Sequence, residues 1–366
     1  PVGDAHFWLI GRDPSGRLST EPYFGLVDEA SKLNLNRAGT NALSYLPNMT
    51  LDFAGAIVDW RNTNGGGAYA LDYSSLGYVD KNYPFETVDE LRLVYGATID
   101  LLVGEDVNRN GVLDSNEKDL NGNGTLDPGL FEYVTVYSRQ PNFHSDGTML
   151  TNVNTRATLR ALLQSTFSSA RANQIMTRLG FTSGGSGGGG AVDPTFNNLM
   201  RFYLSSGMTS AEFAQIAYGI TDTNSLYTNG LLNINTAGAT VMEALFMGLG
   251  VDQDTAQSAA QTLITYRQQN PNNLNAISWI VDALGNTSPV VQHLADANRD
   301  YITTQSFQFT ADIAAVGPFG RGYRRVKFVF DLSEGAPKII YRQDLSRLGW
   351  ALGEKARAAW VAKATQ

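Results

Sequence analysis

The chain contains no cysteine, and this absence excludes several kinds of site at once. The protein can form no disulfide, has no thiolate nucleophile and cannot build a cysteine-based zinc site. Histidine is almost as scarce, because His6, His144 and His293 are the only three and lie far apart in the sequence. No nucleophile elbow, phosphate-binding loop or dinucleotide-binding fingerprint is present. The sequence therefore favours a protein that is not an enzyme, with a calcium-dependent enzyme assembled from distant residues as an alternative.

Charged residues are also few, at 17% of the 366 residues, whereas the chain contains 37 glycines. The surface is therefore expected to be polar mainly through amides and hydroxyls, as in exported proteins with long loops. The formal net charge is -8. An acidic chain is a poor match for nucleic acid or anionic lipid, whose binding depends on clustered Lys and Arg. Acidic oxygen clusters suit divalent cations instead.

Long hydrophobic runs are absent as well. No stretch of about 18 apolar residues occurs, so the sequence predicts no transmembrane helix and no signal peptide within these residues. We expect any export signal or membrane anchor to have been removed from this sequence. The hydrophobic content of 43% is nevertheless ordinary for a folded protein, and the length suits two or three domains.

Alternating apolar patterns near both ends of the chain predict strands, and helical periodicity dominates between them. The expected strands are 6–11, 23–28, 306–310, 325–330 and 338–342, and the expected helical segments are 38–61 with a break at Pro47, 87–95, 159–166, 196–218, 241–267 and 345–362. This order predicts an α+β fold in which helical material is inserted between the pieces of one sheet. Pieces 1–30 and 300–366 would form the sheet, 31–150 a first helical unit, and 151–299 a second helical region. A Gly-rich stretch, 183–190, is expected to be a flexible linker.

A short motif occurs three times, as LNLNRA at 33–38, TNVNTR at 151–156 and LNINTA at 232–237. Each copy precedes a helical segment, so its Asn and Thr residues are predicted to cap helix N-termini. Two copies continue alike, since AGAIVDWR at 54–61 matches AQTLITYR at 260–267. We therefore expect related small helical units.

The strongest chemical signal is the twelve-residue segment from Asp106 to Glu117, which fits the calcium-loop pattern D-x-[DN]-x-[DN]-G-x5-E at every specified position. Gly111 permits the sharp turn of such a loop, and calcium requires six to eight oxygen ligands. The predicted ligands are Asp106, Asn108, Asn110, the carbonyl of Val112, Asp114 and Glu117.

A second copy begins two residues later, and its predicted ligands are Asp119, Asn121, Asn123, Thr125 and Asp127. Its twelfth position is Leu130, so Glu132 or a carboxylate borrowed from the first loop would have to complete it. The loops are too close together for the intervening helices of a regular EF-hand pair. We therefore expect a compact cluster at 105–132 that binds one or two calcium ions in a structural role. An ion-free turn is the alternative, because Asp, Asn and Gly favour turns.

The order of several motifs resembles the general secretion pathway protein K family, the minor pseudopilins of type II secretion systems. The residues that carry the resemblance are DEASKLNLN at 28–36, LP at 46–47, AIVDWR at 56–61, NYPFETVDEL at 82–91 and LNINTA at 232–237. The resemblance extends more loosely over most of the chain.

This resemblance implies a pilin-like antiparallel sheet core with a large helical insertion of the helix-hairpin-helix or SAM-like kind, bound calcium, and a hydrophobic N-terminal anchor helix that this sequence lacks. It also implies a structural component of the inner membrane and periplasm that caps the pseudopilus tip. The expected partners are minor pseudopilins of the I and J types and the pseudopilus. Membrane contact is expected only through the absent helix.

The same repeats also resemble helix-hairpin-helix modules, so a DNA-binding protein of the cell envelope is a further alternative. Such modules contact phosphate through the backbone of a Gly-rich hairpin. The hairpin at 46–50 has no glycine, and the hairpin at 248–252 is followed by acidic residues. Together with the net charge, this disfavours nucleic acid as a partner.

Overall fold

The computed structural model describes residues 4–13, 21–64, 73–181, 193–318 and 322–364. The fold is mixed helix and sheet, as the sequence predicts, and its largest sheet is antiparallel. The predicted linker at 183–190 lies outside the described residues. In the described part of the chain, no helix is long and apolar enough to cross a membrane.

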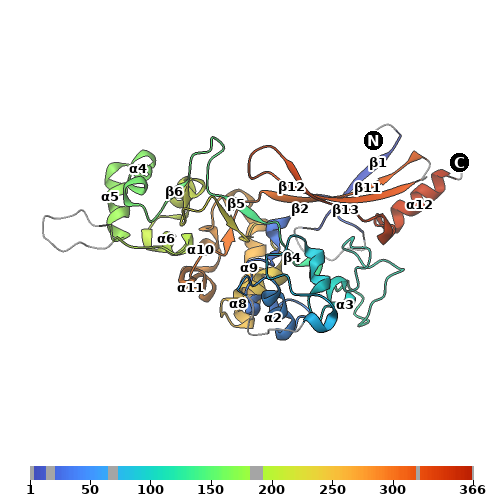
Figure 1. The fold of residues 1–366 in the computed structure, drawn as a ribbon. Coiled ribbons are helices and arrows are strands. Elements are labelled where there is room, and N and C mark those ends of the chain that lie inside the picture. Colours follow the sequence, from blue (N-terminus) through green and yellow to red (C-terminus); the bar gives the residue numbers. More distant parts are fainter. Residues whose placement is uncertain (1–3, 14–20, 65–72, 182–192, 319–321, 365–366) are drawn as a thin grey trace.

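The main sheet joins the two ends of the chain. Its strands are β1 (His6–Ile10), β2 (Val27–Asp28), β11 (Gln308–Val316), β12 (Tyr323–Asp331) and β13 (Lys338–Asp344). The order is β1-β11-β12-β13, and β2 pairs with β11 next to β1. Residues about 300 positions apart thus lie side by side, with the helices of segments 51–103 and 239–269 below the sheet in Figure 1.

Three helical units follow one another between β2 and β11. The first contains β3 (Leu33–Asn34), α1 (Thr40–Ser44), α2 (Leu51–Trp60), η3 (Val88–Leu93), α3 (Ile99–Val103), η4 (Leu130–Glu132) and β4 (Val134–Thr135). The second contains β6 (Thr151–Asn152), α4 (Arg156–Thr166), α5 (Ser169–Arg178), α6 (Leu199–Ser206), α7 (Ser210–Ile216) and β7 (Ile220–Thr221). The third contains β9 (Leu232–Asn233), α8 (Ala239–Gly248), α9 (Gln253–Gln269), α10 (Trp279–Leu284), α11 (Pro289–Asp296) and β10 (Ile302–Thr303).

Each unit is closed by a short parallel strand pair. β3 pairs with β4, β6 with β7, and β9 with β10, so the first strand of every unit lies beside its last. The second unit is inserted between β5 (Arg139–Pro141) and β8 (Tyr227–Asn229), which pair antiparallel. Its helices α4, α5 and α6 project at the end of the molecule farthest from the C-terminus (Figure 1).

The three sequence motifs are equivalent in structure, but they do not cap helices. The side chains of Asn34, Asn152 and Asn233 each accept a hydrogen bond from the backbone N–H two residues later, at 2.8–2.9 Å. The residues before α1, α4 and α8 are Gly39, Thr155 and Gly238, and none makes a side-chain cap. The capping prediction is therefore wrong, because these Asn side chains fold the turn that leaves the strand.

The longer match between the first and third units also corresponds to one structural feature. Arg61, after α2, donates to the carbonyl of Ala38, and Arg267, near the end of α9, donates to the carbonyl of Ala237. Both arginines thus tie the second helix of a unit back to the motif that begins it. Helices α1 and α8 pack so closely that a Cβ on Gly248 would lie 2.6 Å from the Ala42 backbone.

Several predicted boundaries differ from the structure. The predicted strand 23–28 is reduced to Val27–Asp28, and the helix expected at 87–95 is a 3-10 helix, η3. The closing helix α12 (Gly353–Ala364) begins eight residues later than the start of the predicted segment, after η8 (Ser346–Leu348). Gly349, before the helix, and Gly353, its first residue, both have positive φ.

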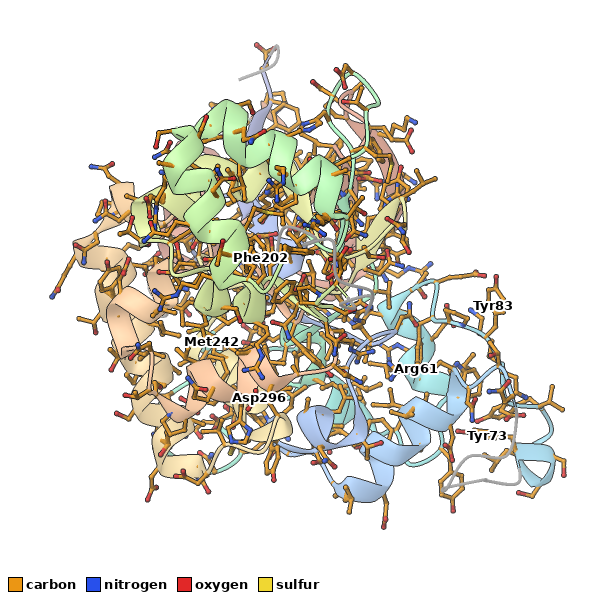
Figure 2. The ribbon with its side chains drawn as sticks, turned by 90° about the vertical axis from the view of Figure 1, so that its left-hand side faces the viewer. Arg61, Tyr73, Tyr83, Phe202, Met242 and Asp296 are labelled. Carbon is orange, nitrogen blue, oxygen red and sulfur yellow. The ribbon has the colours of Figure 1, made fainter. Side chains whose placement is uncertain are left out.

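The helical units share one hydrophobic core, which includes Phe202 of the second unit and Met242 of the third (Figure 2). A separate small core lies at one end of the sheet and contains Ile10, Ala314, Val316, Ala351 and Leu352. The segment before α12 therefore packs on the same face of the sheet as the first helical unit.

Candidate calcium site

The first predicted calcium loop folds around its own carboxylates. Asp106 accepts hydrogen bonds from the backbone N–H groups of Asn110 and Gly111, both at 2.9 Å. Glu117, at the twelfth position, accepts from the N–H groups of Asn108 and Asp114 at 3.0 and 3.1 Å. The first and last predicted ligands therefore shape the same turn.

The middle ligands of the first loop converge on one carboxylate oxygen. The side-chain amides of Asn108 and Asn110 both donate to Oδ2 of Asp114, at 2.6 and 2.8 Å. Val112 is buried, and its N–H donates to the Asn110 side chain. The structure thus brings together all six residues predicted for this loop.

The second loop repeats this pattern residue by residue. Asp119 accepts from the N–H groups of Asn123 and Gly124, as Asp106 does from Asn110 and Gly111. The side-chain amides of Asn121 and Asn123 both donate to Oδ2 of Asp127, at 2.6 and 2.9 Å.

Thr125 completes the correspondence, since its N–H donates to the Asn123 side chain as the N–H of Val112 does to Asn110. Even the backbone matches, because Arg109 and Gly122 both stand at the fourth position with positive φ. The two loops are therefore one structural motif used twice.

Glu105 supplies the carboxylate that the sequence of the second loop lacks. Its side chain accepts from the N–H groups of Leu120 and Asp127, at 2.6 and 2.9 Å. Glu117 makes the matching bond to Asp114 in the first loop. Glu105 is buried, with 3% of its surface exposed, and it directly precedes the first loop.

Glu105 was missed in the sequence because it lies outside the twelve-residue pattern and before the loop that it serves. The backbone brings it there by pairing Gly104 with Pro128 in a β-bridge. The other carboxylate considered for this role, Glu132, instead forms an ion pair with Arg12 at 2.7 Å.

The first loop is attached to the sheet by a fully buried arginine of β12. Arg325 binds both oxygens of Asp312 on β11, at 2.8 and 2.6 Å, and donates to the backbone carbonyls of Asn108 and Arg109. Bidentate pairing of this kind fixes both partners in place. The loop is therefore held against the inner face of the sheet.

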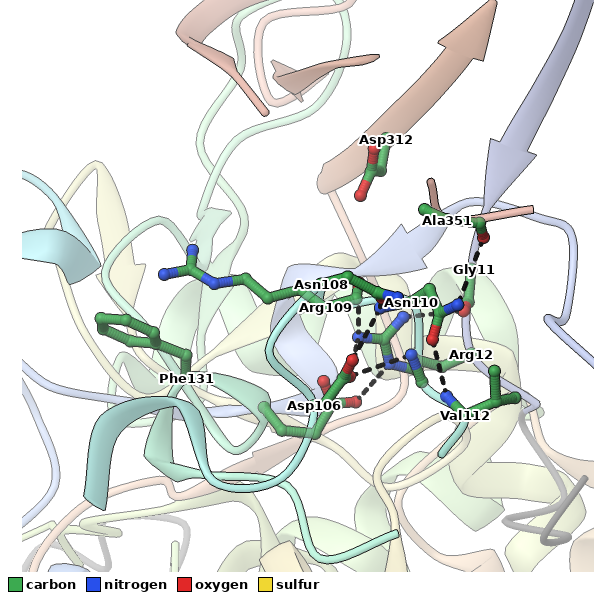
Figure 3. A network of polar contacts seen from close by, with 12 residues as sticks. Gly11, Arg12, Asp106, Asn108, Arg109, Asn110, Val112, Phe131, Asp312 and Ala351 are labelled. Carbon is green, nitrogen blue, oxygen red and sulfur yellow. Dashed lines mark hydrogen bonds and ion pairs between the residues drawn. The ribbon is translucent and has the colours of Figure 1, made fainter. Parts of the chain in front are cut away.

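Two further segments hold the same loop. Arg12, which follows β1, reaches Asp106 at 3.6 Å and the carbonyl of Arg109 at 3.4 Å. The side chains of Asn108 and Asn110 also donate to the carbonyls of Trp350 and Ala351, at 3.3 and 3.4 Å. The N-terminal strand, the middle of the sheet and the C-terminal segment thus meet at this loop (Figure 3).

The two loops differ in exposure, and their electrostatics differ accordingly. Asp106, Asn108 and Asn110 are each at most 3% exposed, whereas Asn121 and Asn123 are exposed. Burial raises the pKa of Asp106 to about 6, although Arg12 opposes the shift. Hydrogen bonds from the Gly124, Gly122 and Asn123 N–H groups lower the pKa of Asp119. An empty first loop therefore carries a desolvated carboxylate that a cation would stabilise.

The residues of both loops fit calcium by their chemistry. Each loop offers carboxylates, amide side chains and a backbone carbonyl, which are the oxygen ligands that calcium prefers. No group of three or more His, Cys, Asp or Glu side chains that could hold a metal ion occurs in the part of the chain that the structure describes. Asparagine supplies part of the ligand set in each loop, so such a group is not required.

The two hairpins considered for DNA binding are helix-turn-helix connections. The first turn contains Asn48 with positive φ, and Thr50 caps α2. The second contains Gly250, and Asp252 caps α9 with a carboxylate at 3.0 Å from the Thr255 nitrogen. An acidic cap at this point would repel a phosphate.

No family model matches this chain, and no curated protein matches its sequence.

Proposed function

We propose that this chain is the calcium-binding, structural part of a minor pseudopilin resembling the general secretion pathway protein K family. In this proposal it caps the pseudopilus tip together with minor pseudopilins of the I and J types. The protein catalyses no reaction; it presents surfaces on which the other components assemble. It would act in the periplasm, anchored in the inner membrane by an N-terminal helix.

The observation that carries the proposal is the unusual distribution of residues on the main sheet. The face toward the helical units carries polar side chains such as Thr310, Asp312 and Arg325, all buried. The opposite face is largely apolar, although it also carries the exposed side chains of Arg324, Arg342 and Asp344. It presents Phe7 and Leu9 of β1, Phe309 and Ile313 of β11, Val326, Phe328 and Phe330 of β12, and Ile339 of β13.

Several residues of this apolar face are open to solvent within the described part of the chain. Phe7 is 48% exposed, Leu9 39% and Ile339 58%. Contiguous apolar surface of this kind marks an interaction site. A sheet with helical units on one face and an apolar opposite face is what a pilin-like core needs to pack against a long hydrophobic helix.

The calcium loops give the proposal its second support. The first loop contacts Arg325 of β12, Arg12 after β1 and the segment before α12, so its order affects the point where these three parts of the chain meet. Calcium, when bound, would neutralise the carboxylates of Asp106, Asp114 and Glu117 and thereby stabilise this junction.

The proposal is tested by mixing the purified chain with the periplasmic parts of I-type and J-type minor pseudopilins from the same organism. Size-exclusion chromatography with light scattering should show a stoichiometric complex that weakens when calcium is chelated. If neither partner comigrates with the chain in calcium, the tip assignment is wrong.

A DNA-retention assay at low salt distinguishes this proposal from the main alternative, a helix-hairpin-helix DNA-binding protein. An acidic assembly protein should leave DNA unbound, whereas a helix-hairpin-helix protein should retain DNA with an affinity that falls steeply as salt rises.

A further inference from the structure

A cavity of about 80 Å³ lies between the main sheet and the first helical unit. The sheet contributes Thr310 and Lys327 to its wall, and the first unit contributes Val103. A larger groove of about 750 Å³ shares Lys32 and Glu132 with this cavity. The cavity therefore adjoins an open region from which a small molecule can enter.

Cationic side chains from distant segments gather at this cavity. Lys327 of β12 lies opposite Asp312 of β11, so both side chains are on the sheet face that is turned toward the first unit. Lys32 lies between β2 and β3, and Arg109 belongs to the first calcium loop. Burial lowers the pKa of Lys327; Glu29 opposes this shift, whereas the charges of Lys32 and Arg109 add to it. Lys327 is therefore close enough to both other cations to be repelled by them.

The carboxylates of the wall already have partners. Glu29 accepts hydrogen bonds from the hydroxyl groups of Thr135 and Thr310. The other wall carboxylates form ion pairs, which join Arg12 to Asp106 and Glu132, Arg325 to Asp312, and both Arg92 and Arg109 to Asp89.

Two lysines remain after these pairs are assigned. Within the described residues, neither Lys32 nor Lys327 forms an ion pair. The Lys32 ammonium group lies 3.5 Å from the carbonyl of Phe131, and both lysines are only half-buried, so a ligand can reach them. In this part of the chain, the wall and its ion-pair partners together contain six cations and five carboxylates, which leaves one positive charge in excess.

The uncharged part of the wall is mainly apolar. Val88, Val103 and Val134 line it from the first unit. The guanidinium carbon of Arg109 lies over the ring of Phe131, 4.5 Å from its centre (Figure 3). Each water-sized group requires about 10–15 Å³ of such a cavity. The volume therefore accommodates a molecule of about five to eight non-hydrogen atoms.

We infer that this cavity binds one short aliphatic monocarboxylate, such as propionate, with its carboxylate between the ammonium groups of Lys32 and Lys327 and its hydrocarbon part against the valine side chains. The two carboxylate oxygens can each accept a charge-assisted hydrogen bond from one ammonium group. A single negative charge matches the excess of one cation, whereas a doubly charged oxyanion would be repelled more strongly by the wall carboxylates. The bound molecule would link β12 to the segment between β2 and β3.

The test is a thermal melt of the full chain near neutral pH with increasing sodium propionate, while sodium chloride keeps the ionic strength constant. Propionamide, an uncharged molecule of the same shape, and sodium sulfate are the comparison ligands. Saturation-transfer NMR detects direct contact between propionate and the protein. The variants Lys32→Met and Lys327→Met each replace one ammonium group by an unbranched apolar side chain. Lys338→Met, on an exposed position of β13, is the matched control.

We expect propionate to raise the melting temperature of the wild type by several degrees with saturation and to give a saturation-transfer signal, whereas propionamide and sulfate do neither. Each site variant should weaken propionate binding at least about tenfold, the scale of one lost hydrogen bond to a charged group, while Lys338→Met binds like the wild type. If Lys327→Met does not fold, Lys32→Met and the ligand series still decide.

The proposal is overturned if propionate and chloride give the same melts and propionate shows no saturation transfer, or if both site variants bind propionate like the wild type. Equal stabilisation by sulfate or by propionamide would overturn the assignment to a monocarboxylate.

Discussion

Glu105 and Glu117 have matching positions in the two calcium loops, although only Glu117 belongs to a complete sequence pattern. Each accepts from the N–H of the aspartate at the ninth position of its loop, Asp127 or Asp114. Their similarity is a property of the folded chain, since Glu105 reaches the second loop from the residue before the first. We therefore expect that calcium binding at each loop can be abolished by a separate substitution.

Glu105→Gln should remove calcium binding at the second loop and leave the first intact, and Glu117→Gln should do the reverse. Each change replaces one carboxylate by an uncharged group of the same size, so we expect affinity at the altered loop to fall at least about tenfold, the scale seen when a group at a metal site is changed. Calorimetric titration of each variant measures this. Parallel loss of both sites in Glu105→Gln would contradict the separate assignment.

Asp300 gives a second prediction at the scale of one residue. Burial and the neighbouring Asp222 raise its pKa to about 8, so the folded protein holds a proton that the unfolded chain releases near pH 4. Because the folded state binds more protons between these values, the stability from this group is fully present below pH 4. It is lost as the pH rises toward 8, by at most about 1.4 kcal/mol per pH unit.

Asp300→Asn retains an acceptor for the Leu199 N–H but cannot ionise. The variant should therefore show a shallower fall in unfolding free energy between about pH 5 and pH 8. Urea unfolding at a series of pH values compares it with the wild type. Identical pH profiles would show that Asp300 does not titrate in this range.

The connection between α3 and the two loops depends on a close approach of two glycine backbones. Gly104 has φ of 65° and ψ of -141°, and a Cβ on it would lie 2.4 Å from the nitrogen of Gly129. This contact sets the β-bridge between Gly104 and Pro128 and thereby delivers Glu105 to the second loop. No other residue has both this backbone freedom and this small size.

Gly104→Ala should destabilise the protein by at least about 2 kcal/mol, because it adds steric overlap to backbone strain. Gly147→Ala is the matched control: Gly147 also has positive φ, but nothing lies within 4 Å of a Cβ added there. It should cost only about 1 kcal/mol. Urea unfolding of both variants measures the difference, and equal losses would show that the contact with Gly129 is unimportant.

At the scale of elements, sequence periodicity predicted the strands of the main sheet and many of the helices, but it missed α3, α5, α10, α11 and the short strands β3 to β10 between the two parts of the sheet. Alternation identified β11 through β13, and Pro47 marked the break between α1 and α2. Capping was wrongly predicted, because Asn favours both caps and turns and only the tertiary context decides between them. Glu105 could not be predicted, since its role depends on a glycine contact between residues 25 positions apart.

The whole molecule is organised around the junction of the sheet with the first calcium loop. The sheet is built from both chain ends, three helical units lie between them, and Arg325 and Arg12 fix the loop where these parts meet. Composition and order predicted the α+β arrangement, but the buried pair of Arg325 and Asp312 was not apparent in the sequence. Both residues belong to strands in which apolar and polar residues alternate. This pattern distinguishes the two faces of the sheet, but it does not show which part of the chain covers the polar face.

The central claim is that calcium stabilises this junction. The most direct measurement is calorimetric titration of calcium into the chelator-stripped chain, with thermal melts before and after. We predict two bound ions, a melting temperature several degrees higher with calcium, and loss of both effects in the Asp106→Ala, Glu117→Ala, Asp119→Ala triple variant. If the stripped wild type binds no calcium and melts at the same temperature with and without it, the loops are only turns, and calcium has no part in the function.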